Sequence, residues 1–152
     1  MEGRGFEIVT TYAGKHIHLP VRKTAASAGY DIEAAEDTVL APQAVTIVPT
    51  GLKAYMEADE YLAIHIRSGI SIKNGLMLVN SVGVIDSDYY NNPDNEGHIM
   101  IAYYNTQSEP FSIAKGERIG QGIFVKYLIT CDDQAQGSRW RFWQYWVAVR
   151  SK

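Results

Sequence analysis

The sequence has a single cysteine in 152 residues, Cys131, and no apolar run long enough to cross a membrane. One cysteine excludes an internal disulfide and fits a reducing compartment. The amino-terminal residues also lack the apolar core of a signal peptide. We therefore expect a cytoplasmic protein with no membrane as a partner.

Positive charge is scarce as well, because 14 Lys and Arg residues face 17 Asp and Glu residues, for a net charge of −3. Proteins that adhere to nucleic-acid backbones rely on an excess of positive charge, so we expect no nucleic-acid partner. Tryptophan is absent before position 140, and all three tryptophans lie between positions 140 and 146. With 46% hydrophobic residues, the chain is long enough to form one domain with a substantial core.

No segment has a convincing helical repeat of apolar residues, and the dominant period is two. In residues 60–68, Leu62, Ile64 and Ile66 alternate with less apolar neighbours, and residues 97–106 repeat this pattern. In residues 121–130, four side chains share one face: Ile123, Val125, Tyr127 and Ile129.

Shorter strands are expected at residues 6–11, 37–40 and 45–49, separated by turns rich in glycine, proline and asparagine. Many short strands at close spacing predict an all-β domain, namely a sandwich, a jelly roll or a barrel.

Four segments contain more glycine and polar side chains than plain turns need: AGYDIEAAED at 28–37, IRSGIS at 66–71, NSVGVIDSDYYNNPDNEG at 80–97 and KGERIGQGIF at 115–124. Taken singly, each is compatible with a turn or a solvated loop. The acidic residues of the third segment do not have EF-hand spacing. His16 and His18 could share a strand face and bind a metal, although two exposed histidines near a terminus usually bind nothing.

Taken in order, the four segments resemble the first four signature motifs of the homotrimeric dUTP diphosphatase (dUTPase) family, and NSVGVIDSDY is the most specific of them. The resemblance spans about residues 28–125. It implies a distorted jelly-roll barrel, assembled as a trimer with active sites between subunits. The reaction it implies is hydrolysis of dUTP to dUMP and pyrophosphate, with Mg²⁺.

The resemblance assigns a role to each motif. Asp86 would deprotonate the attacking water, and Tyr89 would lie against the sugar and exclude a 2′-hydroxyl. The uracil edge would be read by four residues: Asn80, Gly83, Val84 and Ile85. The phosphates would be held by four residues: Arg67, Ser68, Gly69 and Gln121. Asp31 would reach the Mg²⁺ complex through water, and Arg118 would support the subunit interface by ion pairing.

Two features depart from the family pattern. The stretch from Tyr89 to Gly97 is a lengthened loop, which resembles forms from Gram-positive bacteria and their phages. The glycine-rich fifth motif, of the form GGFGSTG, is missing, and the sequence SRWRFWQYW stands at residues 138–146. We therefore divide the chain into a β-barrel domain at 1–136 and an aberrant tail at 137–152.

The tail suggests a frameshift. Tryptophan has the single codon TGG, and a reading frame one base further along turns TGG into a glycine codon. The shifted frame is compatible with GGGFGSTG, which predicts that a base was gained or lost near Gly137 and Ser138. A membrane-surface helix and a docking peptide are the alternatives for the tail. Loss of the arm would weaken hydrolysis, since the arm closes over the bound nucleotide.

Two other functions are compatible with the same motifs. A dCTP deaminase has a similar fold and similar motifs, although Asp86 before Asp88 and Tyr89 favours the hydrolase. A phage-type dUTPase that captures a regulatory protein is the alternative from a different class.

Overall fold

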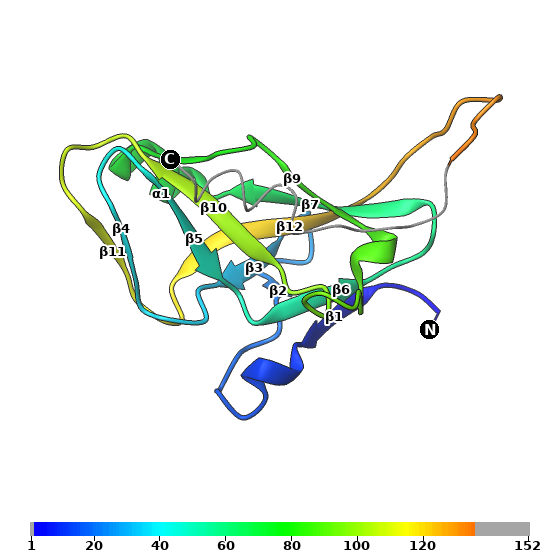
Figure 1. Ribbon diagram of the computed structural model, residues 1–152, viewed down its shortest axis with the longest axis horizontal. Coiled ribbons are helices and arrows are strands. Elements are labelled where there is room, and N and C mark those ends of the chain that lie inside the picture. Colours follow the sequence, from blue (N-terminus) through cyan, green and yellow to red (C-terminus); the bar gives the residue numbers. More distant parts are fainter. Residues whose placement is uncertain (1, 136–152) are drawn as a thin grey trace.

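The computed structural model describes residues 2–135 of the chain, which form an all-β body with one short α-helix (Figure 1). The strands are β1 (Gly5–Ile8), β2 (Val21–Arg22), β3 (Tyr30–Glu33), β4 (Thr38–Leu40), β5 (Val45–Pro49), β6 (Leu52–Tyr55), β7 (Glu60–Ile66), β8 (Leu76–Leu78), β9 (Gly83–Asp86), β10 (Met100–Asn105), β11 (Phe111–Ile113) and β12 (Arg118–Lys126). The helical elements are α1 (Ser68–Asn74) and two 3₁₀ turns, η1 (Thr10–Tyr12) and η2 (Ser87–Tyr89). The predicted all-β class is confirmed.

The strands form four small sheets. The largest has the order β2-β3-β12-β7-β9, and a second has the order β5-β10-β8. The pairs β1-β6 and β11-β4 complete the body and lie toward opposite ends of it in Figure 1. All the strand pairs among residues 2–135 are antiparallel.

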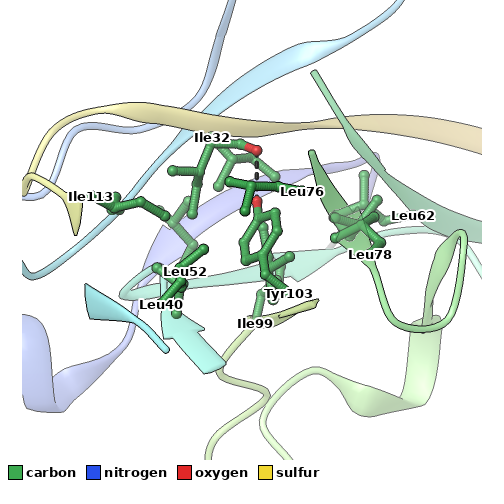
Figure 2. Packing of buried hydrophobic residues seen from close by; sticks show 14 of the residues in the cluster. Ile32, Leu40, Leu52, Leu62, Leu76, Leu78, Ile99, Tyr103 and Ile113 are labelled. Atoms are coloured by element: carbon green, nitrogen blue, oxygen red, sulfur yellow. Dashed lines mark hydrogen bonds between the residues drawn. The ribbon is translucent and has the colours of Figure 1, made fainter. Parts of the chain in front are cut away.

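One apolar core lies between the sheets, and the alternating strands supply it as the period of two predicts. Leu62 and Ile64 of β7 and Ile101 and Tyr103 of β10 are buried in it. Figure 2 shows the Tyr103 ring at the centre of this cluster, and its hydroxyl donates a hydrogen bond of 2.6 Å to the Ile119 carbonyl oxygen. Within residues 2–135 every buried side-chain nitrogen or oxygen has a hydrogen-bond partner.

The prediction that Ile123, Val125, Tyr127 and Ile129 form the apolar face of residues 121–130 is wrong. Strand β12 ends at Lys126, and Tyr127 and Ile129 are 41% and 69% exposed. The side of β12 that packs on the core carries Phe124 and the small Gly122, whose added Cβ would lie 3.0 Å from Leu62. The glycine makes room for core side chains of other strands, so hydrophobicity alone does not reveal which face is buried.

Helix α1 is the element that the apolar period did not indicate. Its seven residues include the 82% exposed Ile72, so it has no buried apolar stripe to detect. It ends at Gly75, which adopts a left-handed conformation with φ 61°. Among residues 2–135, no helix has the length and apolar character that crossing a bilayer requires.

Candidate active site

A cleft of about 740 Å³ opens where β3 and β12 meet the end of β7 and the start of α1. Five residues with predicted roles line it: Asp31, Arg67, Ser68, Gly69 and Gln121. Arg118 and Glu117 of the fourth segment line it too, together with residues that the sequence did not single out, among them Lys23 and Ser27. Three of the four predicted motifs therefore meet in one cleft of a single chain.

The register of the large sheet explains this meeting. Gln121 of β12 lies opposite Asp31 of β3 on one side and opposite His65 of β7 on the other. Directly opposed residues of antiparallel strands project to the same face of a sheet. Arg67 lies two residues beyond His65, so the alternation along β7 directs it toward that face as well.

The Asp31 carboxylate is shared by two guanidinium groups. Arg67 Nε lies 3.5 Å from Oδ1, and Arg118 Nη1 lies 3.3 Å from Oδ2, while the Asp31 side chain is only 15% exposed. The cleft holds three cationic side chains (Lys23, Arg67 and Arg118) against two carboxylates (Asp31 and Glu117). Its local charge is thus positive in a chain whose overall charge is negative.

The backbone at the start of α1 is open to a ligand. Ser68 and Gly69 are the first helical residues, and the amides of a first helical turn have no carbonyl partner within the helix. A Cβ added to Gly69 would meet nothing within 4 Å, so packing within the described residues does not require glycine here.

The loop between β2 and β3 forms a further wall of the cleft through Lys23, Ser27 and Gly29. Arg22 holds this loop, because its Nη1 donates hydrogen bonds of 2.8 Å to the Ala25 carbonyl and 3.1 Å to the Ser27 carbonyl. Its guanidinium also lies 5.9 Å from the centre of the Tyr30 ring. Arg22 was not identified from the sequence, because no motif around it indicated that it would hold this loop.

Asp86 lies at the far end of the same sheet from the cleft. It ends β9 and is paired with Tyr61 near the start of β7, whereas Arg67 directly follows the end of β7. Arg67 lies six positions beyond Tyr61, which is about 20 Å along a strand. Figure 1 agrees, because α1 lies at the left while β9 runs to the right toward the η2 turn. Asp86 and the cleft therefore cannot meet at one small molecule within a single chain.

The environment of Asp86 favours its neutral form more than water does. Partial burial raises the pKa of the Asp86 carboxyl, and the negative charge of Asp88 raises it further. A carboxylate with a raised pKa is a stronger base than an exposed one, which suits proton abstraction.

The segment before Asp86 is a tight turn between strands of two different sheets, rather than a hairpin closed by pairing of its own strands. Strand β8 is bonded to β10, whereas β9 is bonded to β7 and ends the large sheet. The turn is closed by a 2.7 Å hydrogen bond from the Val82 amide to the Asn80 carbonyl, with Ser81 at φ 62°. The outer edge of β9, at Gly83, Val84 and Ile85, faces away from β7.

Tyr89 is almost completely buried, with 6% of the residue exposed, and its hydroxyl is fixed. The hydroxyl donates to the His98 carbonyl at 2.9 Å and accepts from Asn95 Nδ2 at 2.8 Å. Asn95 belongs to the lengthened loop and His98 directly follows it, so the conformation of the loop and the position of the tyrosine depend on each other. The two amino-terminal histidines are separate from this network: His18 Nδ1 lies 2.9 Å from Glu33 Oε2. Within residues 2–135 no three His, Cys, Asp or Glu side chains are placed to hold a metal ion.

Comparison with known proteins gives a consistent result. The sequence profile of the family described as dUTPase matches residues 15–138. A deoxyuridine 5'-triphosphate nucleotidohydrolase of Lactococcus lactis is 53% identical over 136 residues, which cover 90% of this chain and 91% of the relative.

Solved structures agree in fold. The crystal structure of a dUTPase from Streptococcus mutans matches with a TM-score of 0.79 and 48% identity, covering 83% of this chain and 98% of that one. A mutant dUTPase of Staphylococcus aureus phage phi11, described with a structural Mg(II) ion, matches with a TM-score of 0.72 and 19% identity. That match covers 90% of this chain and 99% of the phage chain. The likeness to the Streptococcus structure confirms the predicted jelly-roll architecture.

Proposed function

The chain belongs to the dUTPase family, and from that membership we propose how its own residues divide the hydrolysis of dUTP to dUMP and pyrophosphate between two copies of the chain. The enzyme is a dUTP diphosphatase. We assign phosphate binding to the cleft beside Arg67 and water activation to Asp86 of another protomer.

The cleft binds the triphosphate. Arg67 offers a planar fork of donors, Ser68 and Gly69 offer backbone amides, and Gln121 projects from the adjoining strand into the same space. Arg118 holds the Asp31 carboxylate and keeps a second cation beside the phosphates. The positive local charge favours a polyanion over a neutral sugar or base.

Asp86 accepts a proton from the attacking water. Burial and then the charge of Asp88 raise the pKa of this carboxyl, which makes the ionised carboxylate a stronger base than an exposed one. The oxygen of that water then bonds to phosphorus, pyrophosphate leaves with the electrons of the broken P–O bond, and the proton stays on Asp86 until solvent removes it.

The edge of β9 recognises the base. Because β9 ends its sheet, the backbone groups of Gly83, Val84 and Ile85 that face away from β7 can pair with a uracil edge as an added strand would. Asn80 lies beside this edge, since a Cβ added to Gly83 would be 3.9 Å from Asn80 Nδ2. Tyr89, fixed by His98 and Asn95, lies against the deoxyribose and leaves no room for a 2′-hydroxyl.

The single observation that carries this division is the register of the large sheet, which pairs Asp86 with Tyr61, about 20 Å along β7 from Arg67. A nucleoside triphosphate can touch both only if they come from different chains. A closed ring of protomers satisfies this requirement at every interface, which supports the homotrimer.

Mixing inactive subunits tests the shared site. Arg67→Ala and Asp86→Asn are each expected to abolish pyrophosphate release from dUTP, with circular dichroism and oligomer size unchanged. Refolded together in equal amounts, they should regain about a quarter of the wild-type rate, the fraction of interfaces that draw both intact residues from different chains. No recovery in verified mixed oligomers would overturn the shared site. A dCTP-specific release of ammonia by the wild type would overturn the hydrolase assignment itself.

Mg²⁺ fits the cleft as a companion of the substrate rather than as a resident ion. Of the two acidic side chains that line the cleft, Asp31 lies beside Arg67, and both of its oxygens already face guanidinium groups. A small cation that keeps its waters and binds phosphate oxygens needs no more than such an outer contact. When bound with the nucleotide, Mg²⁺ neutralises phosphate charge that the cleft's cations leave uncompensated. Asp31→Asn should raise the Mg²⁺ concentration needed for half-maximal rate.

Three further expectations concern the tail, the compartment and a protein partner. The aberrant tail at 137–152, its frameshift and the domain boundary at 136 stay predictions, because these residues lie outside the described ones. Sequencing the coding DNA tests the frameshift. Codons that cannot encode GGFGSTG in the frame shifted by one base would contradict it. The exposed lone thiol of Cys131 suits a reducing compartment and supports a cytoplasmic setting. Capture of a regulatory protein also stays a prediction.

A further inference from the structure

We propose that Lys53 is a positioning residue for Tyr89, and that through the loop at residues 90–97 it sets the preference of the enzyme for dUTP over UTP. The inference rests on the proposed role of Tyr89 at the sugar. Lys53 itself lies on β6 and does not line the cleft; its polar contacts are to the loop and to Glu7.

Lys53 is a buried cation, with 9% of its side chain exposed, and three acceptors surround its ammonium group. Its Nζ donates hydrogen bonds of 2.6 Å to Asn91 Oδ1 and 2.7 Å to Glu96 Oε1. It also lies 3.6 Å from Glu7 Oε2 and 5.1 Å from the centre of the Tyr90 ring. Burial alone would lower the pKa of Lys53, but the hydrogen bond and charge of Glu96 outweigh it, so the pKa is raised and the side chain stays charged.

Lys53 donates hydrogen bonds to two residues of the loop, and these are also the two non-glycine residues of the loop whose backbone is in the left-handed region. Asn91 has φ 54° and Glu96 has φ 63°. A glutamate in this conformation is uncommon and must be held there by its surroundings. Lys53 supplies a hydrogen bond to each side chain, and Thr10 adds two more to Glu96 at 2.9 Å.

Within the loop, a continuous set of hydrogen bonds connects these residues to Tyr89. The Asn91 amide donates to the Glu96 carbonyl, and the Glu96 amide donates to the Asn92 carbonyl. Asn92 Nδ2 donates to the Tyr89 carbonyl at 2.8 Å and to Asn95 Oδ1 at 2.8 Å. Asn95 Nδ2 in turn donates to the Tyr89 hydroxyl at 2.8 Å. A shift of the gripped residues therefore moves both ends of the tyrosine.

The same stretch of chain holds the end of the loop. The Gly51 amide donates to His98 Nε2 at 2.9 Å, and the Ile99 amide donates to the Leu52 carbonyl at 2.8 Å. Residues 51–53 thus contact the loop at its start, near its end and just beyond it. One signal of this role was not used: Lys53 is a lone charge between the apolar residues Leu52 and Ala54, both of which are buried in the structure.

Replacing Lys53 by methionine tests the inference, because methionine keeps the length and apolar stem and removes the donors. The matched control is Lys126→Met, which breaks an ion pair of 2.9 Å with Asp59 on the surface of β12. The values of kcat and KM for dUTP and for UTP, taken on the intact oligomer, give the preference. Hydrogen exchange at the Asn91 and Glu96 amides reports the loop directly.

Lys53→Met is expected to lower the preference for dUTP over UTP about tenfold, since sub-ångström displacement of a positioning group has effects of this order. Exchange at the two loop amides should quicken, and Lys126→Met should change neither measurement. Tyr89→Leu should lower the preference too, and Lys53→Met combined with it should add little.

The outcomes separate the two proposals. An unchanged preference in Lys53→Met, with a lowered preference in Tyr89→Leu, overturns the role of Lys53 and leaves that of Tyr89. An unchanged preference in Tyr89→Leu overturns the proposed role of the tyrosine. If Lys53→Met does not fold, Glu96→Gln removes the charge from the exposed end of the same contact, and its preference should fall in the same direction; no fall there overturns the inference.

Discussion

Gly29 lies directly under the side chain of Gln121, and a Cβ added to Gly29 would sit 2.3 Å from Gln121 Oε1. The two residues belong to the loop before β3 and to β12, so a backbone feature of one motif decides where the amide of another can lie. The nearest obstructed atom is the far end of a flexible side chain, which can move aside, while Gln121 Cβ at 3.1 Å must give by a few tenths of an ångström.

Gly29→Ala should therefore displace Gln121 from the cleft without unfolding the protein. We expect kcat/KM for dUTP to fall about tenfold, the scale of one hydrogen bond to a charged group, with the melting temperature nearly unchanged. In a Gln121→Ala background the same glycine substitution should have no further effect on kcat/KM. Additive losses in the double variant would show that Gly29 acts by another route.

The pH profile of hydrolysis should depend on Asp88. Because activity needs Asp86 ionised, the rate falls as the pH drops through the pKa of that carboxyl, which burial and then the charge of Asp88 raise above its usual value. Asp88→Asn removes the second cause, so the acidic limb of log kcat/KM against pH should move to lower pH. Asp132→Asn, an exposed carboxylate elsewhere, should leave the limb in place. An acidic limb at the same pH in Asp88→Asn as in the wild type would contradict the effect of the Asp88 charge on Asp86.

Acid should loosen the anchorage of the loop through Glu96. Hydrogen bonds from Lys53 and Thr10 lower the pKa of Glu96 to about 2, below its ordinary value of 4.5. A carboxyl with a depressed folded pKa stabilises the fold above its unfolded pKa, and this contribution is lost as pH falls from 4.5 toward about 2. The gap in urea midpoint between wild type and Glu96→Gln should thus be wide at neutral pH and narrow near pH ~3.

Glu109→Gln provides the control for that measurement, because Glu109 is an exposed glutamate in the turn before β11. Its urea midpoint should follow that of the wild type at both pH values. A gap for Glu96→Gln that is the same at both pH values would contradict the role of its charge.

The hydroxyl of Tyr103 should matter for stability and not for catalysis. Tyr103→Phe removes the donor to the Ile119 carbonyl in a fully buried setting, which should lower the free energy of unfolding by about 1–3 kcal/mol. The kcat for dUTP should stay the same, since the residue lies in the core. Tyr104→Phe, on the neighbouring and partly exposed position of β10, should change stability little. Urea unfolding of the three proteins checks the expectation.

Local sequence patterns were enough to predict the class of the fold and several of its strands. The alternation in β7 and β10 is strong because each strand buries one face, and residues 45–49 coincide with β5. The order of four polar segments was enough to indicate the family, because their glycines and charged residues stand at fixed spacing that can be read directly from the sequence. Both signals are carried by neighbours along the chain.

Tertiary structure decided what those patterns could not contain. The buried face of β12 follows from Gly122 making room for Leu62, a contact between strands with no trace in hydrophobicity. The separation of Asp86 from Arg67 follows from the antiparallel pairing of β9 with the start of β7. The grip of Lys53 on Asn91 and Glu96 joins residues about 40 positions apart. Each of these features depends on the register and packing of segments that are distant in the sequence. Contacts in the folded structure determine that register and packing, and patterns of neighbouring residues do not.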